Sequence, residues 1–580
     1  MADYFESVDK IPVQQTSISI PSENGLSYNS AQIIEINVPA STKFINPKES
    51  YLQFNVKVSP PSDTSGSLTK LQLDGEIGAN ILIRDIRIYD GNRNTLLEEI
   101  TDYNTMVAMK YDYESNPSIR NKRSLTEGCT MPIPQGRGTR GSTDTYLNQQ
   151  VNNPYYKSNA GDDPNQVAQD SDQYVNAKVT LPLHTGLFQN DKILPVMLLQ
   201  GLHISITLEE DRKVFRMLDS VALGRRTTLN PIFHSINGCA TTGAWASGSA
   251  TTSVYLSNQN NQWETDDCPF SVGEAISFHD MVGGTSASFT GSAFPIITEI
   301  DTDLTYIRLT FASIISLTGV NITTDGAWCV ESKSVEASST FTPTYQISNV
   351  ELVLQSVTVD NRYEQGMIRK MKEGGQISYD FLSVTNYKYS QLVSDRVANI
   401  RLPLDNSRAK SILCVPSDAS VYTSQHNITG NMAGNETYIL APTGTRDFYS
   451  YSCRSGMIGC SDNLTNYVFQ YNGKLQPSRL VDCSKTASKV SISQQHLIEL
   501  DKALTSAGIN THSMRNYSNN FIIGRALALG SGVYDARNRD FNLQVNYQES
   551  SAPTKPHLWK CYVYHIRRLN IKGESISIDI

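Results

Sequence analysis

The chain has 580 residues, of which 39% are hydrophobic and 18% are charged, and it contains 29 tyrosines. This length exceeds what one hydrophobic core usually supports, and the low charge and high tyrosine content favour an all-β protein with two or three domains or one duplicated unit. The formal net charge of −8 excludes a global basic field that would draw the protein to nucleic acid, so no specific nucleic-acid binding is expected.

The N-terminal segment does not resemble a secretory signal. Its first ten residues, MADYFESVDK, are acidic and polar, and no apolar stretch in the chain approaches the roughly 20 residues that a membrane-spanning helix needs. We therefore expect a protein that is made and kept inside a cell, at least until assembly. Residues 1–29 contain only one short alternating piece, TSISI, and predict an N-terminal arm outside the folded domains.

Segments in which apolar and polar residues alternate recur along the whole chain and predict strands. In residues 51–59, Leu52, Phe54, Val56 and Val58 share one face. Comparable segments are residues 81–89, 305–311, 350–359, 398–404, 540–547 and 559–566, and turn signals such as YDGN and YNGK lie among them. Many strands with few helices indicate sandwiches or barrels.

Residues 193–211, ILPVMLLQGLHISITLEED, combine two hydrophobic patterns. The apolar run 193–199 predicts a strand or turn that is covered on both faces. The alternating residues 202–208 then predict a strand with Leu202, Ile204 and Ile206 toward a core and an outer face in water. Together the two patterns predict sheets that are packed face to face.

Two segments predict helices. In residues 95–110, Leu96, Leu97, Ile100, Tyr103, Met106 and Val107 recur at intervals of three and four. In residues 491–508, Leu497, Ile498, Leu500 and Leu504 recur less regularly, and the segment ends near Gly508. One helix is therefore expected in each half of the chain.

The domain organisation follows from interruptions of the strand pattern. Basic residues and a glycine pair in residues 366–380 predict the linker between a longer first unit, residues 30–371, and a shorter second unit, residues 372–580. Residues 238–344 are rich in serine, threonine and glycine but keep strand-like pieces, which predicts a large insertion with some sheet of its own. Residues 111–174 predict a second polar loop.

No motif predicts a catalytic, cofactor-binding or metal site. Gly136, Gly138 and Gly141 match the spacing of a dinucleotide fingerprint, but the residues around them do not form a strand that leads into a helix. The nine histidines include no metal-binding pair, and His203, His496 and His565 lie in expected strands or helices, where a packed imidazole is the simpler interpretation. We therefore expect no enzyme and no cofactor.

The remaining charged and sulfur-containing groups also have simple interpretations. The acidic neighbours Glu209/Glu210 and Asp162/Asp163 point to opposite faces of an extended chain and make poor catalytic pairs. The basic residues at 120–124 and Arg369, Lys370 and Lys372 fit a solvated loop or hinge, because no aromatic residues are interleaved for base stacking. Nine scattered cysteines without a C-x-x-C pair fit reduced, mostly buried thiols.

The order of these elements resembles the double jelly-roll major capsid proteins of double-stranded DNA viruses. Residues 83–112 are similar to the family's segment in which a strand ends in a glycine-containing turn and leads into a short helix beside the first jelly roll. Residues 181–211 resemble its succession of a Pro-Leu strand, a polar turn, an apolar run and an alternating strand. By this resemblance, residues 193–199 lie between the sheets of the first roll.

The resemblance continues through the second half of the chain. Residues 350–368 look like the closing strand of the first roll, residues 397–418 like the first strands of the second roll, and residues 557–580 like its closing strand and tail. Large nucleocytoplasmic DNA viruses usually have an Asp followed by an acidic–Arg pair where this chain reads Asp360, Asn361, Arg362, Tyr363, Glu364. This departure favours the capsid proteins of virophages and polinton-like viruses.

The resemblance implies an all-β fold of two tandem eight-stranded jelly-roll sandwiches with long loop insertions and a few short helices. It implies a structural major capsid protein that forms pseudo-hexameric homotrimers, tiles an icosahedral virion shell and contacts penton and minor capsid proteins. The N-terminal arm would then reach under the shell or along a neighbour.

The alternative from another class is a carbohydrate-binding or carbohydrate-cleaving β protein, because jelly rolls also serve lectins and glycan enzymes. A penton protein is disfavoured because the chain has enough strands for two rolls.

Overall fold

The computed structural model describes most of the chain in ordered segments. They are residues 14–59, 70–73, 77–129, 155–157, 177–217, 227–228, 232–236, 239–241, 248, 250–257, 276–280, 288–289, 295–302, 306–318, 328–332, 344–419, 459, 464–483, 494–512, 521–528, 532–537, 540–547, 553, 556–573 and 575–579. All structural statements below concern these residues. The glycines Gly136, Gly138 and Gly141 and the pair Asp162/Asp163 lie outside them.

The first unit is a sandwich of two antiparallel sheets. One sheet has the order β1 (Gln14–Pro21), β21 (Thr344–Thr358), β4 (Ile45–Ser59) and β9 (Ala177–Pro182), and the short β2 (Ser27–Asn29) also pairs with β21. The other has the order β3 (Ile33–Pro39), β10 (Gly201–Leu208), β6 (Ile83–Asp90) and β7 (Leu96–Ile100). Counted along the chain, the eight main strands give the orders 1-8-3-6 and 2-7-4-5, which define a jelly roll.

The second unit repeats the same topology with eight new strands. Its first sheet has the order β22 (Gln376–Gln391), β29 (His557–Lys572), β24 (Ala409–Asp418) and β27 (Ile523–Ala526), and β30 (Ser575–Asp579) adds to β29. Its second sheet has the order β23 (Val397–Leu402), β28 (Phe541–Tyr547), β25 (Leu464–Tyr471) and β26 (Lys474–Asp482). These are again the orders 1-8-3-6 and 2-7-4-5, so the prediction of two tandem eight-stranded jelly rolls is confirmed.

Alternating residues build the core of the first roll as the sequence predicts. Leu52, Phe54, Val56 and Val58 of β4 are all buried. In the opposite sheet, Ile204 of β10 pairs in register with Ile36 of β3, and the buried isoleucines repeat along both strands. Each sheet therefore contributes one apolar face to a common interior.

The outer face of β10 is less exposed than the sequence predicts. His203 and Thr207 point away from the sandwich interior but are only 3% and 5% exposed. β10 is a central strand, so side chains of β3 and β6 flank it on both sides; His203, for example, lies between Asn37 and Tyr89. The expectation of a wet outer face is wrong for His203 and Thr207, which side chains of the flanking strands cover, whereas Ser205 between them is half-buried.

The apolar run before β10 is a turn of 3-10 helix, η3 (Val196–Leu199), and not a strand. Leu194, Val196 and Leu199 are buried, and Leu194 exchanges two backbone hydrogen bonds with Ile45 at the start of β4. The run is thus the predicted turn, but it is covered only in part, because Ile193 is exposed and Met197 and Leu198 are half-buried.

Four helices of ten residues or more flank the sheets in the described chain. They are α1 (Tyr103–Glu114), α2 (Pro117–Thr126), α5 (Asn361–Lys372) and α9 (Gln494–Ser506). Helix α9 lies where the sequence predicts it. The predicted helix at 95–110 is wrong in its first part: Leu96–Ile100 is β7, which pairs with β6, and the helix begins only after Asp102.

Helix α5 corrects the expectation of an irregular linker at 366–380. Asp360 accepts a hydrogen bond from the Arg362 N–H at the helix start, and Gly374 follows the helix end with φ of +79°. The predicted boundary between residues 371 and 372 therefore coincides with the last turn of a helix, and β22 begins four residues later.

The long insertion forms a separate group of strands. One sheet has the order β12 (Thr227–Thr228), β20 (Trp328–Ser332) and β16 (Ile276–Asp280). The other consists of β14 (Cys239–Thr241), β13 (Ile232–Ile236), β15 (Ala250–Ser257), β19 (Tyr306–Thr318), β17 (Ser288–Phe289) and β18 (Ile297–Thr302). Because β12 and β13 already belong to these sheets, the insertion begins before the predicted residue 238. The predicted sheet within it is present.

A small sheet and short helices surround the base of this insertion. The sheet has the order β11 (Phe215–Met217), β5 (Lys70–Leu73) and β8 (Tyr155–Lys157). Helices α4 (Asp211–Val214) and η2 (Gly78–Leu82) lie at this end of the first roll, whereas η1 (Ala40–Thr42) lies at the opposite end, beside η3 and close to α5. Helix α2 and strand β8 both fall within residues 111–174, which the sequence predicts as one polar loop.

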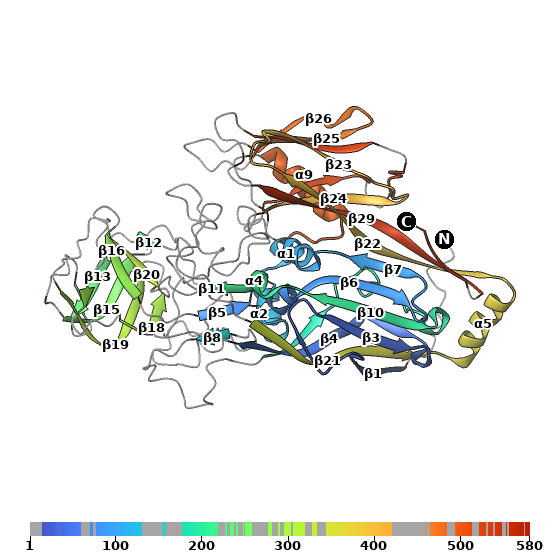
Figure 1. Cartoon of the computed structure of the whole chain (residues 1–580), viewed down its shortest axis with the longest axis horizontal. Coiled ribbons are helices and arrows are strands. Elements are labelled where there is room, and N and C mark those ends of the chain that lie inside the picture. The colour runs from blue at the N-terminus through green and yellow to red at the C-terminus, as the bar shows by residue number, and fades with distance from the viewer. Residues whose placement is uncertain are drawn as a thin grey trace, which may run out of the picture.

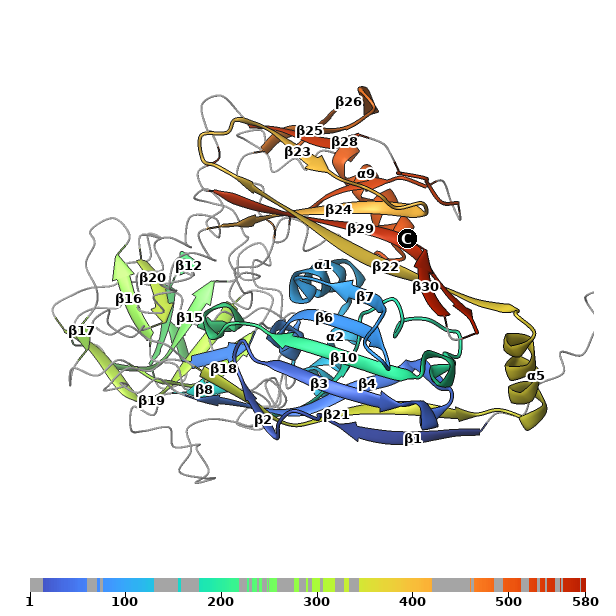
Figure 2. The ribbon, with the colours of Figure 1, turned by 45° about the vertical axis from the view of Figure 1, so that its right-hand side comes forward.

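The two rolls lie side by side, with the insertion at one end of the molecule and α5 at the other (Figure 1). The turned view in Figure 2 shows the same arrangement, with β22 and β29 of the second roll facing α1 and β7 of the first. Buried residues of both rolls belong to one continuous hydrophobic cluster. In the described part of the chain, no helix is long and apolar enough to cross a bilayer.

The predicted N-terminal arm is shorter than residues 1–29. Residues 14–21 form β1 and pair along their whole length with β21, from Gln14 opposite Thr358 to Pro21 opposite Glu351. The segment is polar because β1 is an edge strand whose residues are mostly exposed, yet its backbone completes the sheet. Sparse apolar content therefore does not exclude strand pairing here.

Candidate functional site: the interface between the two rolls

The histidines singled out in the sequence are structural. His496 of α9 is buried, with Nδ1 3.0 Å from the Tyr467 hydroxyl and its ring stacked on Phe521 at 5.2 Å. His203 lies on the outer face of β10, and His565 lies in the middle of β29. The three histidines lie in different sheets or helices, so they do not form one site.

The acidic and basic residues singled out are equally dispersed. Glu209 is buried and its neighbour Glu210 is half-buried, and Lys213 lies within 3.6 Å of both carboxylates. Arg369, Lys370 and Lys372 form the exposed last turn of α5. Among the described residues, no three histidine, cysteine or acidic side chains are grouped as metal ligands.

The charged residues that the structure brings together lie instead between the two rolls. We call this surface the seam; it comprises β7, α1 and the β9–β10 connection on the first roll, and β22 and β29 on the second. Three contacts define it: a lysine–aspartate cluster, a buried glutamate and an apolar patch. None of these contacts is local in sequence.

Asp102 is the centre of the lysine–aspartate cluster. Lys560 of β29 is fully buried, with Nζ 3.6 Å from Asp102 Oδ1, and it donates a 2.8 Å hydrogen bond to Thr105 Oγ1. Lys388 of β22 pairs with Asp102 Oδ2 at 2.6 Å, and Asn386 donates to the same oxygen at 2.9 Å. Burial opposes ionisation of Asp102, but the two lysines and the hydrogen bonds outweigh it and hold its pKa below the ordinary value.

The backbone around Asp102 adds to this contact. Asp102 has a left-handed conformation with φ of +49°, and its N–H donates to Asp85 Oδ1 at 3.0 Å. Its carbonyl oxygen accepts a 3.0 Å hydrogen bond from the Tyr562 hydroxyl of the second roll. The turn between β7 and α1 thus presents a carboxylate and a carbonyl to the same strand, β29.

Glu98 of β7 is the second polar contact and is 1% exposed. Its carboxylate accepts hydrogen bonds from the N–H groups of Gly186 and Leu187, at 2.8 and 3.0 Å, and from the Ser383 hydroxyl of β22 at 2.8 Å. Burial raises the pKa of Glu98 although these hydrogen bonds and nearby Arg567 favour the charged form.

Arg567 of β29 extends the network on the second roll. Its Nη1 donates to the Leu97 carbonyl of β7 at 3.1 Å, and its Nε donates to His565 Nε2 at 3.2 Å. His565 Nδ1 in turn lies 3.1 Å from the Val563 carbonyl, which fixes the neutral tautomer. Burial and the adjacent guanidinium lower the pKa of His565 to about 4.

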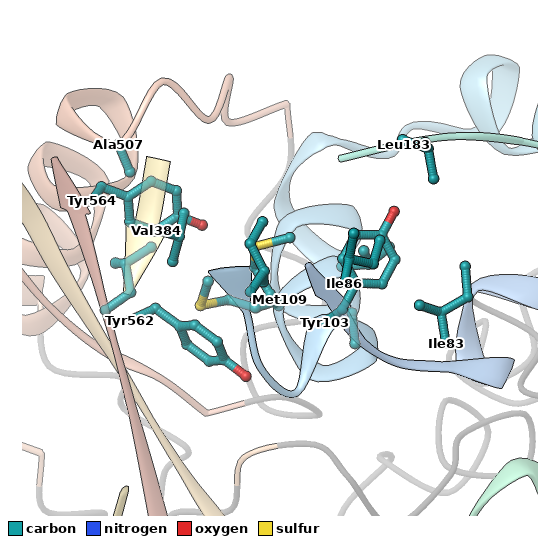
Figure 3. Packing of buried hydrophobic residues seen from close by; sticks show 14 of the residues in the cluster. Ile83, Ile86, Tyr103, Met109, Leu183, Val384, Ala507, Tyr562 and Tyr564 are labelled. Carbon is teal, nitrogen blue, oxygen red and sulfur yellow. The ribbon is translucent and has the colours of Figure 1, made fainter. Parts of the chain in front are cut away.

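Apolar side chains fill the space beside these polar contacts. Figure 3 shows Met109 of α1 reaching toward Val384 and Tyr562 of the second roll, with Tyr103 and Ile86 behind it in the first roll. All five residues are buried and belong to the continuous cluster. A flexible methionine fits such an irregular contact between two curved surfaces.

The two backbones also approach closely at one point. A Cβ atom on Gly186 would lie 2.1 Å from the Leu382 carbonyl oxygen of β22, so only glycine fits there. Nearby, Asn190 donates to the Asp380 carbonyl at 2.8 Å, and the Tyr379 hydroxyl donates to the Lys192 carbonyl at 2.8 Å. The β9–β10 connection is therefore held against β22 by backbone and side-chain contacts.

A second buried polar group secures α1 and α2 against the first roll. The Tyr111 hydroxyl donates to Glu127 at 2.5 Å and lies 2.7 Å from His184 Nε2, while Asn80 also donates to Glu127 at 2.9 Å. Because the Tyr111 hydroxyl donates its proton to Glu127, it can only accept from His184, so His184 Nε2 carries the proton of the ring. The other ring nitrogen, Nδ1, then has no proton and accepts from the Lys110 ammonium at 3.4 Å. Burial raises the pKa of Glu127 and lowers that of His184.

The geometry of the seam fixes the two rolls relative to each other through contacts between residues of the chain itself. Each charged group at the seam forms a hydrogen bond or an ion pair with a residue of the facing roll. The carboxylates of Glu98 and Asp102 are buried. The sequence contains one signal for the seam, which is Lys560 in the mostly apolar strand segment WKCYVYHI. An unpaired charge in a buried strand is costly, so a lysine there indicates a partner of opposite charge.

Comparison with known proteins gives structural matches only. No family model matches the chain, and no curated protein matches it. The Faustovirus major capsid protein is 9% identical, with a TM-score of 0.48 and coverage of 98% of this chain and 92% of that chain. The VP54 protein of PBCV-1, fitted into a reconstruction of the virophage Sputnik, is 9% identical, with a TM-score of 0.45 and coverage of 100% and 99%. The mavirus major capsid protein is 10% identical, with a TM-score of 0.33 and coverage of 97% and 90%.

These identities are too low to transfer a function, and the fold is established by the strand orders of the chain itself. Both units have sheets of order 1-8-3-6 and 2-7-4-5, and the seam joins them through buried contacts. The chain is a double jelly roll.

Proposed function

We propose that the chain is the structural major capsid protein of a double-stranded DNA virus of the virophage or polinton-like type. One observation carries the proposal: the chain contains two complete jelly rolls with identical strand order, locked side by side by a buried seam. The resemblance of strands and turns along the sequence supports the same class.

A locked pair of similar sandwiches is suited to tiling. Three chains around a three-fold axis place six sandwiches in a ring, and a ring with six roughly equivalent sides packs in a hexagonal sheet although its true symmetry is three-fold. The seam makes this possible because it prevents the rolls from rotating against each other. The function is therefore self-association into trimers and then into an icosahedral virion shell, completed by penton and minor capsid proteins.

The two ends of the molecule suggest its orientation in the shell. The insertion between β10 and β21 extends from one end of the first roll, and α5 lies at the opposite end (Figure 1). Long insertions at loop ends disturb no core and vary freely, as expected of the outer surface of a virion. We place the insertion outside and α5 toward the interior.

No reaction is part of this function. Glu98, Asp102, His565 and Arg567 are ionisable groups of the seam with shifted pKa values, and all four contact residues of the chain itself. Their roles in holding α1, β7, β22 and β29 together are complete without a substrate. Buried structural networks shift pKa values as active sites do, so the shifts alone do not imply catalysis.

The test is the mass and outline of the purified protein. Three chains of 64.3 kDa give about 193 kDa, which native mass spectrometry or light scattering should report. Negative-stain images should show particles with a pseudo-hexagonal outline. A stable monomer at micromolar concentrations would contradict the proposal and favour the glycan-binding alternative, which binding to an oligosaccharide array would then test.

A further inference from the structure

Two cysteines of the second roll face each other across neighbouring strands. Cys414 of β24 lies directly opposite Cys561 of β29 in the antiparallel register, and the two side chains are hydrogen-bonded to each other. Both are free thiols in the structure, and both are fully buried. Among the strand pairs that the structure describes, this is the only position at which one cysteine stands opposite another.

The position of the pair meets the geometric requirements of a disulfide. Residues directly opposite each other in antiparallel strands have Cα atoms about 4.5 to 5.5 Å apart, and disulfide-bonded cysteines have Cα atoms about 4.4 to 6.8 Å apart. The two side chains leave the sheet on the same face, so their sulfur atoms lie on one side of it. Bond formation therefore needs rotation of two side chains rather than rearrangement of the strands.

The neighbours of Cys561 show on which face the pair lies. Lys560 and Tyr562, on either side of it, bond to α1 and to the turn before α1 in the first roll. Because successive residues of a strand point to opposite faces, Cys561 points into the second roll, away from the seam. A bond to Cys414 would thus secure, from its inner face, the strand that carries two contacts of the seam.

The bond would also enclose much of the second roll. Four strands, β25 to β28, and helix α9 lie between Cys414 and Cys561 in the chain. A disulfide stabilises mainly by limiting the freedom of the unfolded chain, and the effect grows with the length of the enclosed loop, here roughly 150 residues. At this position a single covalent bond therefore has a large effect on stability.

We propose that Cys414 and Cys561 form an intramolecular disulfide when the folded protein is exposed to a peroxide. The sulfur of one thiol attacks an oxygen of hydrogen peroxide, the O–O bond breaks, and a water leaves with the proton of that thiol, which gives a sulfenic acid. The sulfur of the second thiol attacks the sulfenic sulfur, the S–O bond breaks, and a second water leaves with the proton of the second thiol. Two thiols are oxidised to one disulfide, and one peroxide is reduced to two waters.

Burial makes this reaction slow. Burial, together with contact with Cys561, raises the pKa of the Cys414 thiol well above its ordinary value, so the reactive thiolate is scarce. The pair therefore stays reduced during brief oxidation and reacts on prolonged exposure. In a capsid protein it would stay reduced in the host cell and close in the released virion, where no thiol pool reduces it. This use rests on the proposed function, whereas the disulfide chemistry does not.

Peptide mapping of the purified full-length protein tests the proposal. The native protein is incubated in dilute hydrogen peroxide, the excess is removed with catalase, and the remaining thiols are alkylated with iodoacetamide during unfolding. Trypsin then cuts after Lys410 and Lys560 and releases the two cysteines on separate peptides. Mass spectrometry should find these peptides joined, two hydrogen atoms lighter than their sum, and separated again after reduction with dithiothreitol.

Thermal unfolding provides the second readout. Oxidised wild type should unfold about 10 °C above the dithiothreitol-treated protein, because the covalent loop restricts the unfolded chain. Cys414→Ala and Cys561→Ala should each lose both the joined peptides and this difference in Tm. Cys483→Ala is the matched control, since Cys483 is a free, half-buried cysteine that follows β26 in the same roll, and this variant should retain both.

The outcomes separate this inference from the proposed function. Alkylation of both cysteines after peroxide treatment, or bonds to other cysteines in place of this pair, would overturn the proposal, and the wild-type map decides this even if an alanine variant does not fold. A trimeric wild type in which Cys414 and Cys561 are both alkylated keeps the capsid function and loses the disulfide. A monomeric wild type with joined peptides does the reverse.

Discussion

At the scale of single residues, two buried histidines of the second roll are held in the neutral form. Burial lowers the pKa of His496 to about 4, and burial together with Arg567 lowers the pKa of His565 to about 4. In the unfolded chain both groups have a pKa near 6.5. The folded state therefore binds fewer protons than the unfolded state between these values, and its stability falls as the pH falls from about 6.5 to about 4.

We predict that acidification destabilises the protein through these two histidines. At pH 5 each histidine should cost about 2 kcal/mol of unfolding free energy relative to pH 7. Urea unfolding at the two pH values measures the loss, and the double variant His496→Gln with His565→Asn should show a loss smaller by about 4 kcal/mol than wild type. Gln365→Asn, at an exposed and non-ionisable position of α5, is the control and should show the same loss as wild type. An unchanged pH dependence in the double variant would refute this assignment.

At the scale of secondary-structure elements, the alternating strands were predictable and several helix boundaries were not. The spacing of Leu96, Leu97 and Ile100 continues into Tyr103 and fits a helix, but pairing with β6 makes the first part a strand. The left-handed backbone of Asp102 separates the two elements. A five-residue segment is ambiguous in isolation, and only its neighbour in the sheet decides its structure.

Two missed helices did have signals in the sequence. Asn116 before Pro117 caps α2, with its side chain accepting from the Ile119 N–H at 2.9 Å. Asp360 starts α5, and the basic residues of its last turn, which suggested an irregular linker, are typical of a helix C-terminus.

The seam could not be predicted from the sequence. Lys560 and Thr105 are separated by 455 positions, and Asn386 and Asp102 by 284, so no local pattern connects them. Strand pattern gives the architecture, whereas the interface depends on how two finished sandwiches meet.

At the same scale, strand β1 yields a prediction about the N-terminus. Deleting residues 1–13 keeps β1 whole and should leave its pairing with β21, and the solubility of the protein, unchanged. Deleting residues 1–21 removes β1 and leaves eight residues of β21 without their partner strand, and an uncovered strand edge promotes aggregation. Static light scattering of the two truncated proteins at equal concentration measures the difference. Equal solubility of both would show that β1 does not protect this edge.

At the scale of the whole molecule, the seam makes the two rolls one mechanical unit. Buried residues from both rolls form a single cluster, and polar contacts from Glu98 and Asp102 cross between them. A tile that is joined to its neighbours on several sides must transmit load without internal rotation. A buried charge network with specific geometry serves this purpose better than a smooth apolar contact, because it is satisfied in only one arrangement of the rolls.

The substitution Asp102→Asn tests this coupling. It keeps the shape of the side chain but leaves the Lys560 ammonium, which is fully buried, without its carboxylate. Breaking such a pair should lower the free energy of unfolding by about 3 kcal/mol at neutral pH. Because the pKa of Asp102 lies below its ordinary value, the wild-type contribution is present above about pH 4 and is lost as the pH falls through the folded-state pKa, where the variant and wild type should converge.

Asp540→Asn is the matched control for this substitution. Asp540 pairs with Arg401 at 3.7 Å on the surface, where the two side chains are 61% and 80% exposed, and such pairs contribute less than about 1 kcal/mol. Chemical denaturation of wild type and both variants at pH 7 compares them. If Asp102→Asn shifted stability no more than Asp540→Asn, the lysine–aspartate cluster would be an incidental contact of the seam, and Glu98 and the apolar patch would have to hold the rolls together. A large loss confined to Asp102→Asn would establish that the buried charge cluster holds the two sandwiches in the fixed geometry that tiling requires.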